Sequence, residues 1–274
     1  MSTLLQISDP HFGTEQAPVV EALVALAQAE RPDLVVLSGD ITQRATAEQF
    51  AAARAFVDRL GAPCLAIPGN HDIPLFDVAA RAFAPYARFS KVFGDELEPE
   101  FESADLLVLG VNTTRPWRHK NGEVSAPQIE RVAQRLAKAR PEQLRVVVVH
   151  QPIEVLRSED EHDRLRGHAP AQQAWAAAGA DLVLGGHIHL PFAAPLPGLA
   201  REMWVVQAGT AVSSRVRDGA PNSVNVVRWV GRASGQGCAI ERWDFDATTQ
   251  RFALAARNVV GLRAGTSGAL LVHS

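Results

Sequence analysis

The sequence predicts an α/β protein in which two stacked sheets are flanked by helices. In the first two thirds of the chain, short apolar runs alternate with amphipathic segments, as in buried strands joined by helices. After Gly209 apolar and polar residues alternate instead, and turn-like stretches separate the segments. We therefore expect one domain over residues 1–274 whose sheet is extended by a C-terminal β meander, residues 202–262.

Six short apolar runs, partly β-branched, predict the buried strands. They are Leu4–Ser8, Leu34–Ser38, Cys64–Ile67, Leu106–Val111, Val146–Val149 and Leu182–Leu184. Three alternating segments predict antiparallel strands and hairpins near the C-terminal end. These are Asn222–Val230, Cys238–Asp246 and Arg251–Val260.

Helix signals lie between the predicted strands. Thr46 with Gln49, and Ser125 with Gln128, have the spacing of capping boxes, and each pair precedes apolar residues at helical spacing. A third helix is predicted over Ala171–Ala180. The irregular segment 73–102, rich in aromatic and charged residues, is predicted to be an inserted cap.

Composition narrows the classes of function. With only two cysteines, a disulfide framework or a thiolate metal site is not expected, and a reducing cytoplasm fits best. The N-terminus lacks signal-peptide features, and no run of 18 or more apolar residues predicts a membrane span. The net charge of −3 does not indicate the basic surface that duplex nucleic acid requires, but it is compatible with a small anionic substrate.

Metal-competent side chains follow five of the predicted strands. Because the carboxyl ends of strands in an open α/β sheet share one edge, we expect these side chains to converge. The set is Asp9 and His11, then Asp40, then Asn70 with His71 and Asp72, then His150, and finally His187 and His189.

Each fragment alone has a structural alternative. A Gly-Asp pair after a strand is commonly a turn or helix entry, GNHD could be a polar turn, and a lone His150 could be a buried, hydrogen-bonded histidine. Chance agreement of all five, in order and each at a strand end, is far less expected. His187 and His189 are the strongest pair, since residues two apart on a strand point to one side. The other histidines, His119, His162, His168 and His273, are predicted to be solvated surface residues.

The ordered set D-x-H, GD, GNHD, H and GHxH resembles the calcineurin-like metallophosphoesterase superfamily. That resemblance implies a four-layer α/β/β/α sandwich of two mixed sheets flanked by helices. Within the superfamily, GDITQRA and GNHD are most similar to the class III cyclic nucleotide phosphodiesterases and their glycerophosphodiesterase relatives. Two departures are Pro10, where Leu or Thr is commoner, and Gln151, where that branch often has a second histidine.

The resemblance also implies a pair of metal ions. One would be held by Asp9, His11, Asp40 and His189, and the other by Asp40, Asn70, His150 and His187. Mixed imidazole and oxygen ligands suit Mn, Fe, Co or Zn better than Ca or Mg. His71 would contact the phosphoryl group and protonate the leaving oxygen, and Asp72 would fix the orientation of a histidine or be a simple turn residue. Gly39, Gly69, Gly185 and Gly186 would let the backbone approach the metals or take left-handed torsions.

These residues predict a dinuclear metal-dependent phosphoesterase that hydrolyses a small phosphodiester, of the cyclic nucleotide or glycerophosphodiester class, by hydroxide attack on phosphorus. The alternatives are a phosphomonoesterase, a nuclease of the same superfamily, or a non-catalytic scaffold. Segment 73–102 and the loops Arg115–Glu123 and Arg157–Ala169 are expected to line the cleft, with Arg115 and His119 as possible substrate contacts. A homo-oligomer formed through the cap or the C-terminal strands is possible.

Overall fold

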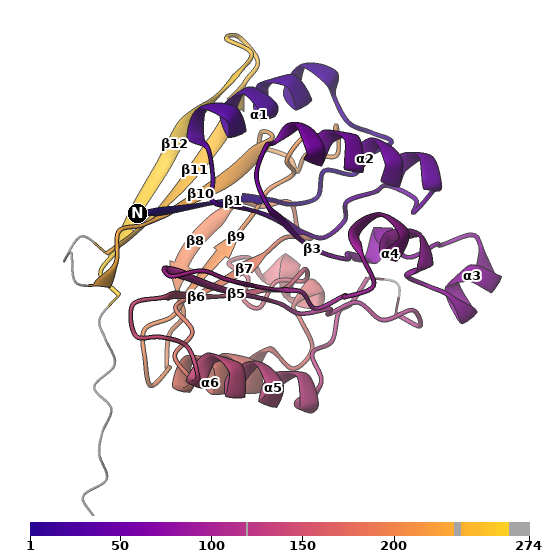
Figure 1. The fold of residues 1–274 in the computed structure, drawn as a ribbon. Helices are drawn as coiled ribbons and strands as arrows, with labels where there is room; N and C mark the ends of the chain where they lie inside the picture. The colour runs from indigo at the N-terminus through magenta and orange to yellow at the C-terminus, as the bar shows by residue number, and fades with distance from the viewer. Residues whose placement is uncertain (119, 233–236, 263–274) are drawn as a thin grey trace, which may run out of the picture.

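Two mixed six-stranded sheets lie face to face, with helices covering their outer surfaces (Figure 1). This computed structural model describes residues 1–118, 120–232 and 237–262. The first sheet has the order β12-β11-β10-β1-β2-β3, and the second has the order β4-β5-β6-β7-β9-β8. Helices α1 and α2 cover the first sheet, and α5 and α6 cover the second. The predicted sandwich of two sheets flanked by helices is therefore confirmed.

The strands have the following bounds: β1 Ser2–Ile7, β2 Leu34–Ser38, β3 Cys64–Ile67, β4 Glu100–Glu102, β5 Leu106–Gly110, β6 Leu144–Val148, β7 Leu182–Gly185, β8 Phe192–Pro195, β9 Trp204–Gln207, β10 Ser223–Trp229, β11 Cys238–Asp246 and β12 Arg251–Val260. The helices are α1 Ala17–Glu30, α2 Ala47–Arg59, α3 Val78–Phe83, α4 Ala87–Phe93, α5 Ala126–Ala137 and α6 His168–Ala177, with 3₁₀ turns η1 Asn70–Asp72 and η2 Ser158–Asp163. Every strand that the apolar runs predicted is present within two residues of its expected bounds.

The alternation of side chains along each strand builds three apolar layers. In β1, Leu5 and Ile7 pack under α1 and α2, whereas Leu4 points between the two sheets. In β6, Val146 points between the sheets and Val147 packs under α5 and α6. Strands buried on both faces read as continuous apolar runs, which is why they are recognisable in the sequence without any period of two.

The C-terminal region divides between the two sheets. Strands β10, β11 and β12 form the antiparallel meander that extends the first sheet beside β1. Strand β9 instead pairs parallel with β7 in the second sheet, and β8 pairs antiparallel with β9. The expected meander over residues 202–262 therefore begins only at β10. Strands β8 and β9 have four residues each, too few for a strong sequence pattern.

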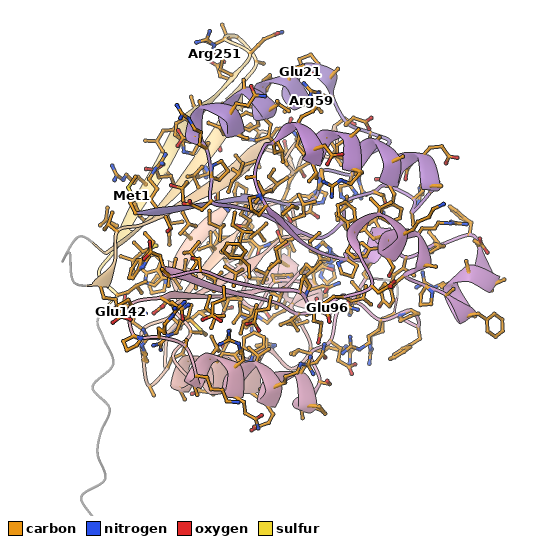
Figure 2. The ribbon with its side chains drawn as sticks, viewed as in Figure 1. Met1, Glu21, Arg59, Glu96, Glu142 and Arg251 are labelled. Atoms are coloured by element: carbon orange, nitrogen blue, oxygen red, sulfur yellow. The ribbon has the colours of Figure 1, made fainter. Side chains whose placement is uncertain are left out.

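The helix caps follow the sequence closely. The Thr46 side chain accepts a hydrogen bond from the backbone N–H of Gln49, but the Gln49 side chain accepts from Arg44 rather than closing the box. Ser125 and Gln128 form the full reciprocal box at the start of α5. Between α1 and α2, Arg59 donates to Glu21 at 2.9 Å, so the helices covering the first sheet are also joined at their surface (Figure 2).

Segment 73–102 contains α3, α4 and the edge strand β4 (Figure 1). The rings of Phe89 and Phe93 in α4 pack near Phe50 of α2, and β4 pairs antiparallel with β5. Two of its elements are therefore built into the layers of the sandwich. Over the described residues, no helix is both long and apolar enough to cross a membrane.

We expect Leu4→Ala to destabilise the protein strongly. Leu4 is fully buried between the sheets, and deleting a buried leucine side chain costs about 2–5 kcal/mol through lost transfer energy and the cavity left behind. The matched control is Leu254→Ala on the exposed face of β12, for which a change within about 0.5 kcal/mol is expected. Urea unfolding followed by circular dichroism measures both, and equal losses would contradict the layer assignment.

Candidate metal centre

The carboxyl ends of strands from both sheets meet at one place. Asp9 and Asp40 follow β1 and β2 in the first sheet, and His150 and His187 follow β6 and β7 in the second. All seven sequence-predicted metal ligands lie there, and the structure groups six of them into clusters whose ligand atoms are within 4.8 Å of one another. The seventh, Asn70, places its Oδ1 3.2 Å from Nε2 of His150.

One cluster consists of Asp9, His11 and His189. The Nε2 atoms of His11 and His189 lie 3.2 Å apart. Oδ1 of Asp9 lies 3.3 Å from Nε2 of His189 and 3.8 Å from Nε2 of His11. Two imidazole nitrogens and a carboxylate oxygen therefore face one point, a donor set that suits a transition-metal ion.

The second cluster consists of Asp40, His150 and His187, and a third group, His11, Asp40 and His71, shares a member with each of these clusters. Asp40 also links the two clusters: its Oδ1 lies 3.3 Å from Nε2 of His150, and its Oδ2 lies 3.8 Å from Nε2 of His11. One carboxylate thus offers an oxygen to each side. This is the arrangement expected of a carboxylate shared by two ions.

Backbone carbonyls fix the tautomers of two of these histidines. Nδ1 of His150 lies 2.9 Å from the carbonyl of Ser38, and Nδ1 of His189 lies 2.6 Å from the carbonyl of Arg215. Because a carbonyl only accepts hydrogen bonds, each Nδ1 must carry the proton. In the neutral ring Nε2 is then left with its lone pair directed into the cluster, as in histidines that bind metals.

His187 provides a further test of fit. Its Nδ1 is buried and has no hydrogen-bond partner among the described residues, and the same holds for Oδ1 of Asp163. Nε2 of His187 lies 3.5 Å from that Oδ1. A buried polar atom without a partner is costly, and a metal ion at Nδ1 would satisfy it. The residues present therefore fit a pair of metal ions.

The backbone around the site is strained. Of the eight non-glycine residues with positive φ in the described chain, five are candidate ligands: Asp9, His11, Asp40, His187 and His189. Each such conformation costs about 1–3 kcal/mol and persists only where its surroundings enforce it. Of the predicted glycines, Gly39 has a positive φ of 94°. Gly69 and Gly186 are required for lack of space, because a Cβ at these positions would overlap Asp40 and Ser8, respectively.

Charge within the cluster sets the protonation of its members. Burial lowers the pKa of His11 to about 3. Burial also disfavours the charged form of His150, but the adjacent Asp40 outweighs it and raises the pKa of His150 to about 9. Burial likewise opposes ionisation of Asp40, yet the neighbouring histidines hold its pKa well below the usual value.

We expect metal binding to release protons at neutral pH. His150 has a pKa raised from 6.5 to about 9, so it is protonated in the metal-free protein, and an ion can bind Nε2 only after that proton leaves. Apparent Mn²⁺ affinity should therefore rise with pH up to about 9, by up to about tenfold per pH unit for one released proton.

Titration calorimetry in buffers of different ionisation enthalpy measures the released protons. His168→Gln, which removes a histidine at the start of α6 that bonds to the Leu165 carbonyl, is the control and should leave the release unchanged. An affinity that stays flat between pH 6.5 and about 9 would contradict the assignment of the raised pKa.

Of the two roles predicted for Asp72, the partner of a histidine or a turn residue, its contacts agree with the second. Its carboxylate accepts hydrogen bonds from the backbone N–H groups of Ile41, Thr42 and Gly69 and from the Thr42 hydroxyl, and none of the described residues bonded to it is a histidine. Asp72 therefore joins the loops after β2 and β3 instead of orienting a histidine, because backbone amides already occupy its oxygens. Burial raises the pKa of Asp72 to about 6.

A cavity of about 320 Å³ opens over the two clusters. The described residues that line it are Asp40, Asn70, His71, Lys120, Asp160, Asp163, His187, Ile188, His189, Arg215 and Arg217. The loops that were expected at the mouth, 115–123 and 157–169, supply Lys120, Asp160 and Asp163. Among the described lining residues, none comes from 73–102 or is Arg115, whose guanidinium bonds to Gln128. His119 and His273 lie outside the described residues.

Six residues of this cavity were not named individually from the sequence, although the first three lie in loops expected at its mouth: Lys120, Asp160, Asp163, Ile188, Arg215 and Arg217. Asp160 and Asp163 lie on the 3₁₀ turn η2, and Lys120 lies in a loop without a motif. Arg215 had a signal, because it follows the AGTA stretch at 208–211. The unusual Gln151 does not line the cavity. It is buried, accepts from the Thr113 hydroxyl and donates to the carbonyl of Lys120, and so holds the loop that carries Lys120.

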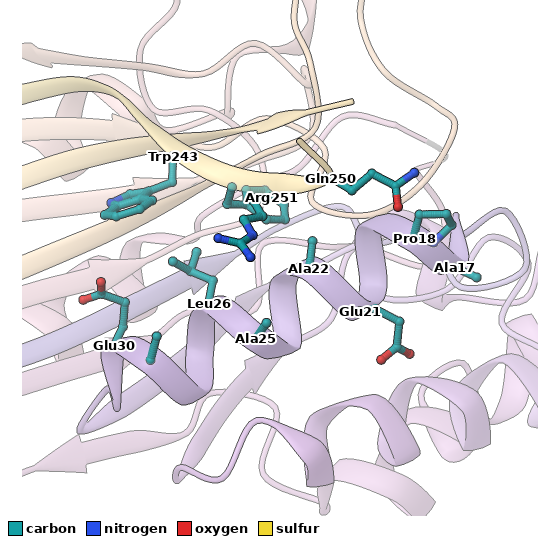
Figure 3. Close-up of a pocket in the computed structure, with 12 residues that line it drawn as sticks. Ala17, Pro18, Glu21, Ala22, Ala25, Leu26, Glu30, Trp243, Gln250 and Arg251 are labelled. Atoms are coloured by element: carbon teal, nitrogen blue, oxygen red, sulfur yellow. The ribbon is translucent and has the colours of Figure 1, made fainter. Parts of the chain in front are cut away.

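A larger hollow lies elsewhere, between α1 and the β11–β12 hairpin (Figure 3). Its volume is about 820 Å³, and Ala22, Leu26, Trp243 and Phe252 give it an apolar lining. None of the three candidate metal-ligand groups found among the described residues contributes to it. The chemistry therefore belongs to the smaller cavity.

The sequence profile of calcineurin-like phosphoesterases matches residues 2–191. The chain belongs to this family. The family hydrolyses phosphoric esters with divalent metal ions, which confirms the predicted family and class of enzyme.

Two curated relatives are phosphodiesterases. A probable cyclic nucleotide phosphodiesterase of Synechococcus sp. is 26% identical over 208 residues, which cover 69% of this chain and 74% of that protein. A cAMP/cGMP dual specificity phosphodiesterase of Mycobacterium tuberculosis is 27% identical over 248 residues, covering 79% and 73%.

Solved structures share the fold. A purple acid phosphatase from yellow lupin seeds superposes with a TM-score of 0.70 at 11% identity, over 94% of this chain and 53% of its own. The chain thus spans about half the length of the lupin protein. A dimetal phosphatase from Danio rerio gives 0.63 at 12% identity, over 88% and 95%. At such identities these likenesses show the fold alone.

We expect Asp163→Asn to weaken metal retention. The Asp163 carboxylate lies 3.5 Å from Nε2 of His187 and so favours the tautomer that leaves Nδ1 free for an ion. Losing such a partner typically costs about 10- to 100-fold in metal affinity. Metal content after dialysis, measured by atomic absorption, should fall toward one ion per chain. Glu161→Gln, an exposed change on the same 3₁₀ turn, is the control, and equal metal content in both variants would contradict this role.

Proposed function

We propose that the protein is a dinuclear metal-dependent phosphodiesterase that acts on a small molecule of the cyclic nucleotide or glycerophosphodiester class. The observation that carries the proposal is the pair of imidazole–carboxylate clusters joined by Asp40 beneath one cavity. A volume of about 320 Å³ is at the small end of ligand cavities, so it favours a small substrate over a polymer. The curated relatives support the cyclic nucleotide class.

The proposed ligands would divide as the clusters do. Asp9, His11 and His189 would hold one ion, and Asn70, His150 and His187 would hold the other, with Asp40 shared. Mn, Fe, Zn or Co suits this donor set. Two such ions would lower the pKa of water and neutralise phosphoryl oxygens during in-line displacement.

His71 is the proposed proton donor to the leaving oxygen. Its Nδ1 lies 2.9 Å from the carbonyl of Gln43, so this nitrogen carries a proton and Nε2 is the atom available for exchange. The backbone N–H of His71 donates to Oδ1 of Asp40 at 2.7 Å, which holds the residue at the edge of the clusters. Asp72 would act indirectly, by joining the loops on which Asp40 and His71 stand.

We also propose the cytoplasm as the location of the protein. Cys64 and Cys238 are free thiols, a state that a reducing compartment maintains.

Hydrolysis of bis(p-nitrophenyl) phosphate by Mn²⁺-loaded protein tests the proposal. Asp40→Ala should lose both ions and bring hydrolysis down to the level of the buffer blank, because it removes the shared carboxylate. Asp58→Asn, an exposed change on α2, is the control and should keep wild-type rates.

Turnover of p-nitrophenyl phosphate, 3′,5′-cyclic AMP and a glycerophosphodiester then defines the substrate class. The proposal requires the diesters to exceed the monoester in kcat/KM. If fully metal-loaded protein hydrolysed no phosphoester in this panel, it would be a non-catalytic member of the fold.

A further inference from the structure

The segment after β9 is attached to the candidate metal centre at two points. The backbone N–H of Ala211 donates to the carbonyl of Ser8 at 3.0 Å, next to Asp9. The carbonyl of Arg215 accepts from Nδ1 of His189 at 2.6 Å and from the Thr210 hydroxyl at 3.0 Å. The backbone of Arg215 is therefore fixed relative to the clusters.

The Arg215 side chain lies in the cavity beside an amide and two imidazoles. Its Nη1 donates to Oε1 of Gln43 at 2.9 Å and lies 3.2 Å from Nε2 of His71 and 3.5 Å from Nδ1 of His11. Within the described part of the chain, no carboxylate lies within ion-pair distance of this guanidinium. Its positive charge is thus not balanced locally, and it faces the same space as Nε2 of His71.

Arg217, two residues later, lines the same cavity but has a structural role. It forms ion pairs with Asp160 at 2.8 Å and Glu159 at 2.5 Å, and it also donates to the carbonyl of Ile188. Those contacts join the 208–217 segment to η2. The charge of Arg217 is therefore neutralised by carboxylates, whereas the charge of Arg215 is not.

We propose that Arg215 is a further catalytic residue, whose guanidinium binds a non-bridging oxygen of the substrate's phosphoryl group beside His71. This inference rests on the proposed phosphodiesterase function. Guanidinium groups bind phosphate oxygens with strong, charge-assisted hydrogen bonds. The guanidinium of Arg215 has no carboxylate partner among the described residues, so it is available for this contact.

The contact favours catalysis because negative charge builds up on the phosphoryl group during the reaction. In diester hydrolysis the oxygen of hydroxide bonds to phosphorus and the bond to the leaving oxygen breaks. The leaving oxygen takes the Nε2 proton of His71, which enters the step as an imidazolium and leaves it as a neutral imidazole, with Nη1 of Arg215 turned from Nε2 to the phosphoryl oxygen. While both oxygens are partly bonded, the phosphoryl group carries more negative charge than the diester did. A fixed guanidinium at that point stabilises the transition state more than the ground state, which raises kcat.

The test compares Mn²⁺-loaded wild type, Arg215→Ala, Arg215→Lys and Arg54→Met on bis(p-nitrophenyl) phosphate. Removing one such donor costs about 10²- to 10³-fold in kcat. We expect a loss of that size for Arg215→Ala, a partial loss for Arg215→Lys, and wild-type rates for Arg54→Met, which removes an exposed arginine on α2. Added guanidinium ion should restore part of the activity of Arg215→Ala and leave the other proteins unchanged.

Three further measurements distinguish the outcomes. Metal content and melting temperature are recorded for each variant; if Arg215→Ala loses metal in step with activity, Arg215 supports His189 and the inference is wrong. It is also wrong if Arg215→Ala keeps kcat within about twofold of wild type, far less than the loss of such a donor. Inorganic phosphate affinity of the metal-loaded proteins tests the anion contact without turnover. Weaker phosphate binding by Arg215→Ala would support the contact even if wild type hydrolysed no diester, which would overturn only the proposed function.

Discussion

The carboxylate of Asp40 is the centre on which this site depends. One of its oxygens faces His150 and the other faces His11, and its backbone follows a strand of the first sheet while His150 follows a strand of the second. This position requires a left-handed backbone at Asp40 and a glycine at position 69, where any Cβ would overlap it. The low pKa of Asp40 and the high pKa of His150 both result from their contact inside an apolar sandwich.

Much of this arrangement could be predicted from the chain. The fully buried strands read as apolar runs, and the rule that strand ends share an edge brings Asp9 and Asp40 together in the first sheet. His187 follows a strand of the second sheet, so its approach to them depends on the sandwich that the resemblance implies. The sandwich itself and the enzyme class follow from the order of five motifs. The identity of the substrate does not, because the loops that carry Lys120 and Asp163 have no periodic pattern from which to place them.

Two features could not be predicted from the sequence: the backbone torsions of the site and which arginines lack an acidic partner. Nothing in the identity of Asp9 or His187 indicates a positive φ, because only the packing of both sheets enforces it. Arg215 and Arg217 look alike in SSRVR, and only their neighbours distinguish a neutralised arginine from an unbalanced one. The place of Asp72 in GNHD suggests a histidine partner, yet the amides of the facing loop reach its carboxylate first.

The origin of the ligands from two different sheets has a consequence for the lifetime of the protein. An ion bound by side chains from both sheets joins them as a cross-link would, and any species that binds only the native form shifts the unfolding equilibrium in proportion to the logarithm of its free concentration. Conformational stability is thereby tied to metal supply. In a cell starved of these metals, the two halves of the sandwich would separate more often, and proteases would remove the chain sooner.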